Sequence, residues 1–599
     1  MEYDIVSIMI PKEMLGFRPK ISSWFRSADV RQIGLLAAVF FLLTLAFTWP
    51  LLKEMGRAVV GQYGDNLYFI WLIGWTEKAI FELHQSPLVS YLLNYPEGWR
   101  LASSESTPLM VLTGLPFSML GGATFGYNAS IVISFVLSGV FTGYWVARLT
   151  GSTWSGIVSG VIFAFAPFRM SHFLVGHLNI LGTHWLVLYF LAMFEVLAST
   201  GRARLWMAIA VISLGLIALT SNYYLYMTLI LSVPYVVAGA ALLRPPETPY
   251  GKSLFRASAV LLLAAPIVLI AVAPYLIAAV EGYLPVRPLG LSGMYSASPT
   301  DYLLPFTGHP LWGDSVGYRF DRSLWPEATL YLGVVSSLLA LVAIVKRKII
   351  PLGSNKTAFF VVIVIAAFIL SMGSQLRWLS QPVNVELPQA LSFLRSDDES
   401  SLAMPALLLY RYLPFYASMR VAMRYAVYVI LFVSLLAGSA VAWLLSKSRP
   451  GLRVPIAIAV MGLVILDFLP PAWSFTEVKG RAVDDWLATQ PNTGAVAQFP
   501  LHIARDQEQL YYTLVHGKPI IVPHADFDTL QFVRVESSLK EFPAAESIET
   551  LRELGVRYIL VDGNWYSERH LLDDIQLALA DQGVNLINSV DEQYVYILE

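Results

Sequence analysis

Cysteine is absent from this sequence, and charged residues are scarce. None of the 599 residues is Cys, so disulfides, thiolate metal sites and cysteine nucleophiles are excluded. Asp, Glu, Lys and Arg make up only 14% of the chain, whereas a soluble domain carries about a quarter. The sequence also lacks a basic stripe or a Lys/Arg-rich run, which argues against a nucleic-acid partner.

Hydrophobic residues, in contrast, form 56% of the chain, and the mean hydropathy is +0.59. Both values are typical of a polytopic membrane protein. The remaining charge is unevenly placed. Residues 473–599 hold 20 acidic and 9 basic side chains, a net charge of −11, whereas residues 1–472 have a net charge of +9. We therefore expect a membrane body followed by a soluble, acidic domain.

Eleven segments are long and apolar enough to cross a bilayer as a helix, which takes about 20 residues. Two further segments, 67–83 and 106–122, are interrupted by polar residues or by Pro and Gly. We expect these two to lie along the outer surface. The eleven predicted spans are residues 32–52, 127–147, 154–170, 179–199, 205–221, 224–243, 257–280, 327–345, 357–373, 422–445 and 454–472.

The Lys and Arg residues of the short loops set the orientation. With the N-terminus in the cytoplasm, the later basic clusters also fall inside. We expect function on the outer face, because loops held by a scaffold usually carry it. The predicted domains are a cytoplasmic segment 1–31, a transmembrane domain 32–472 with outer loops 53–126, 282–326 and 374–421, and an extracytoplasmic soluble domain 473–599.

The acidic tail has the pattern of an α/β domain, so the whole chain is predicted to be a mainly α transmembrane bundle with an α/β domain at its C-terminus. No phosphate loop, paired-glycine fingerprint or nucleophile elbow occurs in the tail, so we expect no catalytic centre there. The predicted strands are 494–499, 518–522, 556–561, 584–589 and 594–598, and the predicted helices are 483–489, one that ends at Gly555, and 570–581.

Three acids in the first outer loop are candidates for chemistry. Asp65 follows the first span at the start of an amphipathic segment, where it can cap a helix, act as a general base at the membrane surface, or do both. Glu97 lies in a Pro-Glu-Gly turn and Glu105 in a Ser-rich stretch. These two either share an outer pocket with Asp65 and contact substrate, or serve the turn and solvent.

The stretch between the third and fourth spans is apolar except for a few polar residues, among them Arg169, His172 and His177. The five-residue spacing of the histidines is poor for a two-histidine metal clip on one helical face. An arginine suits phosphate through its bidentate fork, and a histidine can add a donor. The alternative is a polar end that reaches the lipid headgroups. We favour phosphate binding, because polar groups at membrane depth tend to be functional.

Two later outer segments add five candidate substrate contacts. Asp301, His309 and Trp312 lie in a loop that is rich in turn formers and aromatics. Either this loop lines a cleft, with Trp312 stacked on a sugar ring, or the three residues only stabilise the conformation of the loop. Arg420 and Arg424 are four residues apart, hence on one helical face, at the outer end of a span. This position opposes the positive-inside bias and suggests an anionic ligand such as a lipid phosphate, with headgroup contact as the alternative.

These features resemble the GT-C superfamily of integral membrane glycosyltransferases, which take sugars from polyprenyl-phosphate donors. The chain is similar in particular to a largely uncharacterised prokaryotic group placed near those enzymes. The stretches that carry the resemblance are Gly64-Asp65-Asn66, Tyr95-Pro96-Glu97-Gly98, Ala166-Pro167-Phe168-Arg169, Gly176-His177-Leu178, Asp301-Tyr302-Leu303-Leu304-Pro305 and His309-Pro310-Leu311-Trp312-Gly313.

The resemblance implies an inverting glycosyltransferase of the prokaryotic plasma membrane, with Asp65 as the base that activates an acceptor hydroxyl. Its partners would be a polyprenyl-phosphate-linked sugar donor, a glycan, lipid or protein acceptor, and membrane lipids. Relatives often carry a second acid where this chain has Asn66, so a divalent metal, Mg²⁺ or Mn²⁺, stays open as a cofactor. The alternatives are a lipid or polysaccharide transporter, disfavoured by the lack of an internal repeat, and a non-catalytic scaffold that presents the C-terminal domain.

Overall fold

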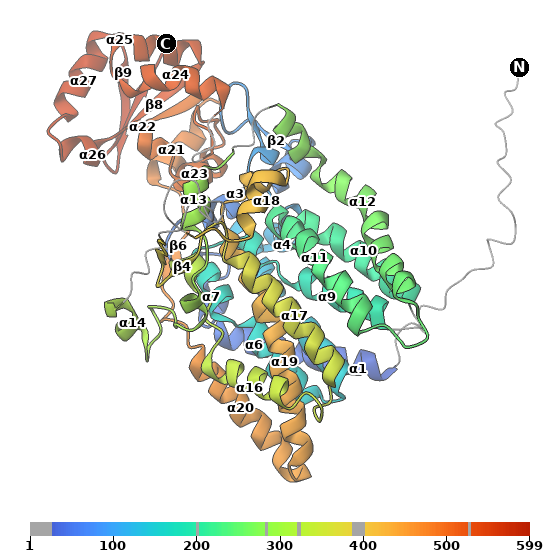
Figure 1. The fold of residues 1–599 in the computed structure, drawn as a ribbon. Coiled ribbons are helices and arrows are strands. Elements are labelled where there is room, and N and C mark those ends of the chain that lie inside the picture. Colours follow the sequence, from blue (N-terminus) through green and yellow to red (C-terminus); the bar gives the residue numbers. More distant parts are fainter. Residues whose placement is uncertain (1–26, 199–202, 282–285, 320–324, 386–401, 525–528) are drawn as a thin grey trace, which may run out of the picture.

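The structure is a computed structural model that describes residues 27–198, 203–281, 286–319, 325–385, 402–524 and 529–599. It has two parts, a large bundle of helices and a smaller α/β body at the C-terminal end of the chain (Figure 1). Most of the predicted cytoplasmic segment 1–31 lies outside the described residues.

Long apolar helices make up the bundle, and they confirm a polytopic membrane protein. In the described ranges, nine helices are long and apolar enough to cross a membrane, or ten if one bent pair is a single span. The central ones, α5 and α19, are mostly buried, whereas α12 and α20 are mostly exposed at the periphery. The nine are α1 (Ser27–Phe47), α5 (Ala123–Thr150), α8 (Leu178–Leu181) with α9 (His184–Ala198), α10 (Ala203–Thr220), α11 (Asn222–Leu242), α12 (Tyr250–Val280), α17 (Ser354–Ser371), η8 (Ala422–Tyr425) with α19 (Ala426–Lys447), and η9 (Pro450–Leu452) with α20 (Arg453–Asp467).

One predicted span, 154–170, is bent. It consists of α6 (Thr153–Ala164) and α7 (Pro167–Leu174), whose axes differ in direction by 43°. The break follows from Pro167, because a proline pushes the residue before it out of the helical region, and Ala166 is indeed extended, with φ −54° and ψ 144°.

The predicted span 327–345 is wrong as a single helix. It is divided into α15 (Trp325–Ala328) and α16 (Val334–Val345). The second helix begins late because Gly333 takes a positive φ of 82° and because the carboxylate of Asp467 accepts the N–H of Val335 at 3.0 Å. The 12 residues that remain are fewer than the ~20 that a perpendicular crossing requires.

The two interrupted segments, 67–83 and 106–122, are short helices outside the candidate spans, as expected. They are α3 (Asp65–Glu77), extended by η3 (Lys78–Glu82), and α4 (Pro108–Gly121). The other short elements of the membrane body are α2 (Leu51–Glu54), β1 (Ala58–Val60), β2 (Val89–Ser90), β3 (Trp99–Arg100), η4 (Leu101–Ser103), α13 (Leu289–Met294), η5 (Pro299–Tyr302), α14 (Gly313–Arg319), β4 (Arg377–Trp378), β5 (Gln381–Pro382), α18 (Ala406–Tyr412) and η7 (Tyr416–Ser418).

The C-terminal domain contains a four-stranded sheet in the order β7-β8-β10-β9, with β7 and β8 parallel and the other pairs antiparallel. Its strands and helices are α21 (Ala482–Thr489), β7 (Ala495–Phe499), α22 (Leu501–Ala504), α23 (Gln507–His516), α24 (Leu530–Lys540), α25 (Ala545–Glu553), β8 (Val556–Asp562), α26 (Gly563–Ser567), α27 (Leu572–Asp581), β9 (Asn585–Val590) and β10 (Gln593–Ile597). Four of the five predicted strands and all three predicted helices are present, whereas α22, α23, α24 and α26 were not predicted.

The predicted strand 518–522 is not formed, apart from a single parallel bridge between Ile520 and Val496. Its backbone groups bond instead to the first outer loop. The N–H of Tyr95 donates to the carbonyl of Ile520 at 3.1 Å, and the N–H of Asn94 donates to the carbonyl of Val522 at 3.0 Å. The segment therefore joins the two parts of the molecule rather than extending the sheet.

Two further contacts fix the C-terminal domain on the first outer loop. Strand β1 pairs antiparallel with β6 (Phe475–Glu477), at the start of the tail. The indole N–H of Trp71 on α3 donates to the hydroxyl of Thr513 on α23 at 3.0 Å, and both side chains are buried. In Figure 1 the domain accordingly lies against the end of the bundle that carries α3.

Candidate active site

Asp65 is the first residue of α3, where a negative charge is favoured by the helix dipole. It is not the N-cap: Gly64 holds that position and no side chain caps the helix there. The carboxylate of Asp65 turns instead to His177, whose Nε2 lies 3.2 Å from its Oδ2. The Asp65 side chain remains about half exposed, at 51%, so it can meet a substrate.

A glycine explains how His177 reaches the start of α3. Gly176 has a φ of +79°, and a Cβ at this position would lie only 2.6 Å from the backbone nitrogen of Asn66. Glycine is free of both the conformational cost and the clash. Any larger residue would push the loop that carries His177 away from Asp65.

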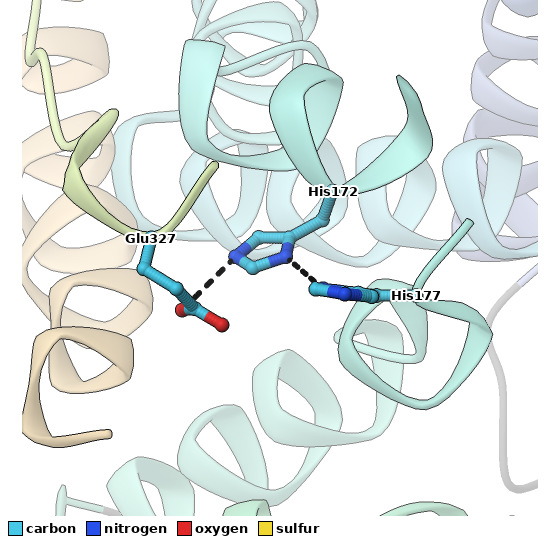
Figure 2. A group of neighbouring side chains, drawn as sticks. All are labelled: His172, His177 and Glu327. Atoms are coloured by element: carbon cyan, nitrogen blue, oxygen red, sulfur yellow. Dashed lines mark hydrogen bonds and ion pairs between the residues drawn. The ribbon is translucent and has the colours of Figure 1, made fainter. Parts of the chain in front are cut away.

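From His177 a chain of contacts leads into the protein (Figure 2). Nδ1 of His177 lies 2.7 Å from Nδ1 of His172, and Nε2 of His172 lies 3.6 Å from Oε2 of Glu327. Arg424 closes the chain, because its Nε and Nη2 donate to the Glu327 carboxylate at 2.5–3.2 Å. We call Asp65, His177, His172, Glu327 and Arg424 the polar chain.

The polar chain is one proton or one cation short of being satisfied. It has three contacts that involve imidazole nitrogens, from Asp65 to His177, between the histidines, and from His172 to Glu327. A neutral imidazole donates one hydrogen, so two neutral rings satisfy the two shorter contacts, and Nε2 of His172, buried at 3.6 Å from Glu327, is left without a hydrogen-bond partner in the described part of the chain. The group therefore suits either proton transfer or the binding of a positive ion.

Both carboxylates of the polar chain are held ionised. Burial acts to raise the pKa of Asp65, but the hydrogen bond and charge of His177, together with the charges of His524 and Arg424, lower it below its ordinary value. Burial also acts to raise the pKa of Glu327, but the charge of Arg424, aided by His172, lowers it to about 2. Asp65 is thus an ionised carboxylate near neutral pH.

A cavity of about 350 Å³ lies beside the polar chain, which we call the groove. Its walls are mainly apolar residues of α11 and α12, among them Leu229 and Val272, and its polar lining residues include Glu105, Tyr275 and Arg287. A mainly apolar cavity with a few polar groups matches an amphipathic ligand.

A shared helix, α3, and one direct contact connect the groove to the polar chain. The hydroxyl of Tyr68, one turn after Asp65, bonds to the hydroxyl of Ser104 at 2.6 Å, and Ser104 lines the groove. On the other side, the guanidinium of Arg424 lies over the ring of Tyr223 at 4.5 Å, and Tyr223 also lines the groove.

Glu105 serves both the fold and the groove. Its carboxylate accepts the N–H of Asn222, the first residue of α11, at 2.9 Å. Burial raises the pKa of Glu105 above its ordinary value, although the hydrogen bond from Asn222 opposes the rise. Glu105 lines the groove, whose lining does not include Asp65, and a pocket that Glu105 shares with Asp65 stays a prediction.

Arg169 requires a correction, because its guanidinium is buried behind the site rather than presented to it. The side chain is 1% exposed. It donates to the carbonyls of Ala164 and Leu181 and to the hydroxyl of Ser134 at 2.7–3.1 Å, and it lies over the ring of Phe135 at 4.3 Å. These contacts tie α6, α8 and α5 together through the two terminal nitrogens of the guanidinium, while its buried Nε has no hydrogen-bond partner among the described residues.

Four other candidates also lie outside the polar chain and the groove. Asp301 is buried and accepts the N–H of Ser298 in a capping box. Asp301 thus holds its own loop, whereas His309, which is buried and accepts the N–H of Leu311, also has its Nε2 3.3 Å from the carbonyl of Asp467 on α20. Trp312 is 54% exposed near α14, and Glu97 is exposed in a turn whose backbone meets the C-terminal domain.

Arg420 and Arg424 do not form the predicted pair on one helical face, because the helix starts later, at η8. Arg424 is buried and bound to Glu327. Arg420 is half-buried with its guanidinium 5.5 Å from the ring of Tyr295. Contact of Arg420 with an anionic ligand stays a prediction.

Sequence reasoning missed Glu327, Tyr223, Tyr275 and Arg287. Glu327 was assigned to the start of a span, where its charge is costly unless it is used. That cost was the signal that could have identified it. The two tyrosines and Arg287 carry no such signal, since they become site residues only when α11, α12 and the outer loops meet.

The polar chain also contains possible metal ligands. Nitrogen and oxygen atoms of His172, His177 and Glu327 all lie within 4.8 Å of one another. Two imidazoles and one carboxylate suit zinc, whereas Mg²⁺ and Mn²⁺ prefer oxygen ligands, so those two ions fit poorly. Asp65 would then be the carboxylate that orients a ligating histidine. Arg424 competes for Glu327, which a bound metal would have to share.

Comparison with solved structures gives the fold a place among known proteins. AftD, an arabinofuranosyltransferase from Mycobacteria, is 14% identical with a TM-score of 0.51 over 89% of this chain and 36% of its own. ArnT from Cupriavidus metallidurans bound to undecaprenyl phosphate is 12% identical with a TM-score of 0.49, over 97% of this chain and 98% of its own. AglB from Archaeoglobus fulgidus, in complex with an inhibitory peptide and a dolichol-phosphate, is 14% identical with a TM-score of 0.43, over 92% and 72%.

The fold is therefore of the GT-C type, as the similarity to AftD indicates. Comparison with curated proteins finds no match. A family model described as a domain of unknown function (DUF6311) matches residues 34–437, which include the polar chain and the groove. The chain belongs to the DUF6311 family.

Proposed function

We propose that this chain is a membrane glycosyltransferase that moves a sugar from a polyprenyl-phosphate donor to an acceptor hydroxyl. Asp65 takes the proton of that hydroxyl as its oxygen attacks the anomeric carbon. The bond from that carbon to the phosphate oxygen breaks, the phosphate leaves with the electron pair, and the configuration inverts. The observation that carries the proposal is the half-exposed, ionised Asp65 held by His177 beside an apolar groove.

The groove supplies a place for the donor lipid. Its apolar walls on α11 and α12 are membrane helices, so an isoprenoid chain can enter from the bilayer. The phosphate lies beside the polar lining residues, which include Arg287, and Arg420 follows the lining residue Met419 in the chain. Two arginines near a leaving phosphate would stabilise the charge that develops in the transition state.

His177 and His172 position Asp65 in this proposal. A carboxylate that is fixed by one imidazole and kept ionised has a defined direction of attack, and general-base help of this kind contributes about 10²–10⁴-fold to the rate. When a zinc-type ion is bound by His172, His177 and Glu327, it would supply positive charge next to Asp65. We place the acceptor, the outer loops and the C-terminal domain on the extracytoplasmic face of a prokaryotic plasma membrane.

The test is transfer of a radiolabelled sugar by the purified protein from a panel of polyprenyl-phosphate donors, with Asp65→Asn compared with the parent. We expect the variant to lose about 10²–10⁴-fold in turnover and to keep its expression and thermal stability. Asp314→Asn is the matched control, because Asp314 is an exposed acid in another outer loop, on α14.

Unchanged turnover in Asp65→Asn would remove Asp65 as the base. Parent protein that transfers no sugar from any donor, yet moves labelled lipid across a vesicle membrane, would favour the transporter class instead. Metal content, measured on the same purified preparations, shows whether His172→Ala releases zinc.

A further inference from the structure

A second cavity, of about 660 Å³, lies in the C-terminal domain. It opens at the carboxyl ends of the adjacent parallel strands β7 and β8. The chain leaving β7 contributes His502, and the chain leaving β8 contributes Trp565 and Tyr566 on α26. Ligands of α/β sheets bind in the crevice outside the carboxyl ends of the strands, and this volume is within the ~300–1,000 Å³ of typical small-molecule sites.

Aromatic rings form fixed walls of this cleft. The Arg569 guanidinium lies 4.0 Å from the centre of the Trp565 ring and also donates to the Trp565 carbonyl at 2.9 Å, which holds the indole in place. Phe499, at the carboxyl end of β7, and Phe542 also line the cleft, and their rings are stacked on each other with centroids 3.7 Å apart. A rigid aromatic side chain such as Trp565 binds a flat apolar face at little cost in conformational entropy.

The polar groups of the cleft carry both signs in equal number. Glu536 lies 3.8 Å from Arg505 and 2.9 Å from Lys540, and Asp574 adds a second carboxylate at the rim. The side chains therefore offer donors and acceptors together, with no net charge. An anionic ligand gains nothing from this balance, and a fully apolar one would leave the charged groups without water.

We propose that the cleft binds a glycan. A sugar ring has apolar C–H faces that stack on aromatic rings and hydroxyls that both donate and accept, which is the combination that this lining offers. Because the proposed function requires an acceptor hydroxyl on the same side of the membrane, the bound glycan is the acceptor or part of it. This last step rests on the proposed function, whereas glycan binding itself does not.

The experiment measures binding of the full-length protein in detergent to an array of short oligosaccharides built from neutral, amino and acidic sugars. The strongest arrayed oligosaccharide is then titrated by calorimetry. We expect Trp565→Ala to weaken binding about tenfold or more. Asp574→Asn is expected to weaken it as well, and this exposed residue can be changed without loss of the fold. Leu577→Ala is the matched control, because Leu577 lies on the same helix, is 64% exposed and does not line the cleft.

Binding of no oligosaccharide, or equal binding by the parent, Trp565→Ala and Asp574→Asn, would overturn the proposal. So would preferential binding of a fatty acid or a peptide that Trp565→Ala abolishes. The transferase assay is read separately with Asp65→Asn. If the parent transfers sugar, Asp65→Asn does not, and no oligosaccharide binds the parent, only the cleft proposal fails. If the parent binds an oligosaccharide but transfers no sugar, only the proposed function fails.

Discussion

Arg169 and Arg424 lie in the same helical bundle and are both buried, yet their surroundings differ in kind. Arg169 is surrounded by neutral acceptors, two backbone carbonyls and one hydroxyl, and by the ring of Phe135. Arg424 is bound by two oxygens of Glu327, which continues through two histidines to Asp65 at the surface.

The groups that bind a buried charged side chain therefore indicate whether that side chain stabilises the fold or controls the charge of a functional site. A guanidinium that satisfies carbonyls at a break between helices serves the fold, since those carbonyls would otherwise lack partners. A guanidinium that holds a carboxylate next to titratable groups controls their charge, and it lowers the pKa of Glu327. Such perturbed groups gather at functional sites.

Replacement of Arg424 by Met is expected to have the largest effect on this comparison. It leaves Glu327 buried without its main partner, at a cost of about 3–5 kcal/mol in the free energy of unfolding. The double variant Arg424→Met with Glu327→Gln should recover much of that stability, because the uncompensated charge is gone. The measurement is thermal unfolding of the purified protein, with the sugar-transfer rate recorded on each variant.

The matched variant Arg169→Met separates the two roles. It should also lose stability, since three acceptors lose their donor, but the folded fraction should retain its transfer rate. Recovered stability without recovered transfer in the Arg424/Glu327 double variant agrees with a functional chain. If that double variant transfers sugar at the full rate, Glu327 and Arg424 have only a structural role.

The same contrast between neutral and charged partners can be made for buried histidines, with His516 of the C-terminal domain compared with His172. His516 is 5% exposed, and its Nδ1 accepts the N–H of Lys518 at 3.0 Å; among the described residues no carboxylate forms an ion pair with it as Glu327 does with His172. Burial, with the charges of Arg481 and Lys518, lowers the pKa of His516 to about 3.

The neutral form of His516 is therefore favoured by folding. Its contribution to stability is complete above the unfolded pKa of ~6.5 and declines as the pH falls toward 3. At pH 5 the domain should have lost about 2 kcal/mol from this residue. His516→Gln, which keeps an acceptor but does not titrate, should remove that part of the pH dependence when thermal unfolding is compared at pH 8 and pH 5. Equal slopes for both proteins would contradict the assignment.

The sequence was sufficient for most of the fold, because hydrophobic length and helix-ending residues are local signals. The exceptions were set by distant contacts. Segment 327–345 has the composition of a span, but its helix is delayed by the carboxylate of Asp467, more than a hundred residues away. Segment 518–522 has the pattern of a strand, but its backbone bonds to residues 92–95.

Less of the candidate site was predictable. Asp65, His172 and His177 stand out because they interrupt apolar sequence, and the structure brings them together. A charged residue in apolar sequence does not show whether its partners will be backbone carbonyls, as for Arg169, or a carboxylate, as for Arg424. Only the packing of distant segments decides this. The two roles become distinct once each guanidinium has its partners.

A substitution in the groove is expected to have the smallest effect, a rise in the KM for the donor. Leu229 lines the groove on α11, so Leu229→Trp fills space that the proposed donor lipid needs. The KM for the polyprenyl-phosphate donor should rise by roughly tenfold, about 1.4 kcal/mol, with little change in kcat, since the substitution removes ground-state and transition-state binding equally.

Val233→Trp is the matched control, because Val233 is one helical turn further along α11, 63% exposed and outside the groove. It adds the same indole to the lipid-facing surface and should leave the KM unchanged. An equal rise in both variants would mean that the helix surface rather than the groove contacts the lipid. A change in kcat for Leu229→Trp alone would place the groove in contact with the polar chain during the reaction, through Tyr223 and Arg424.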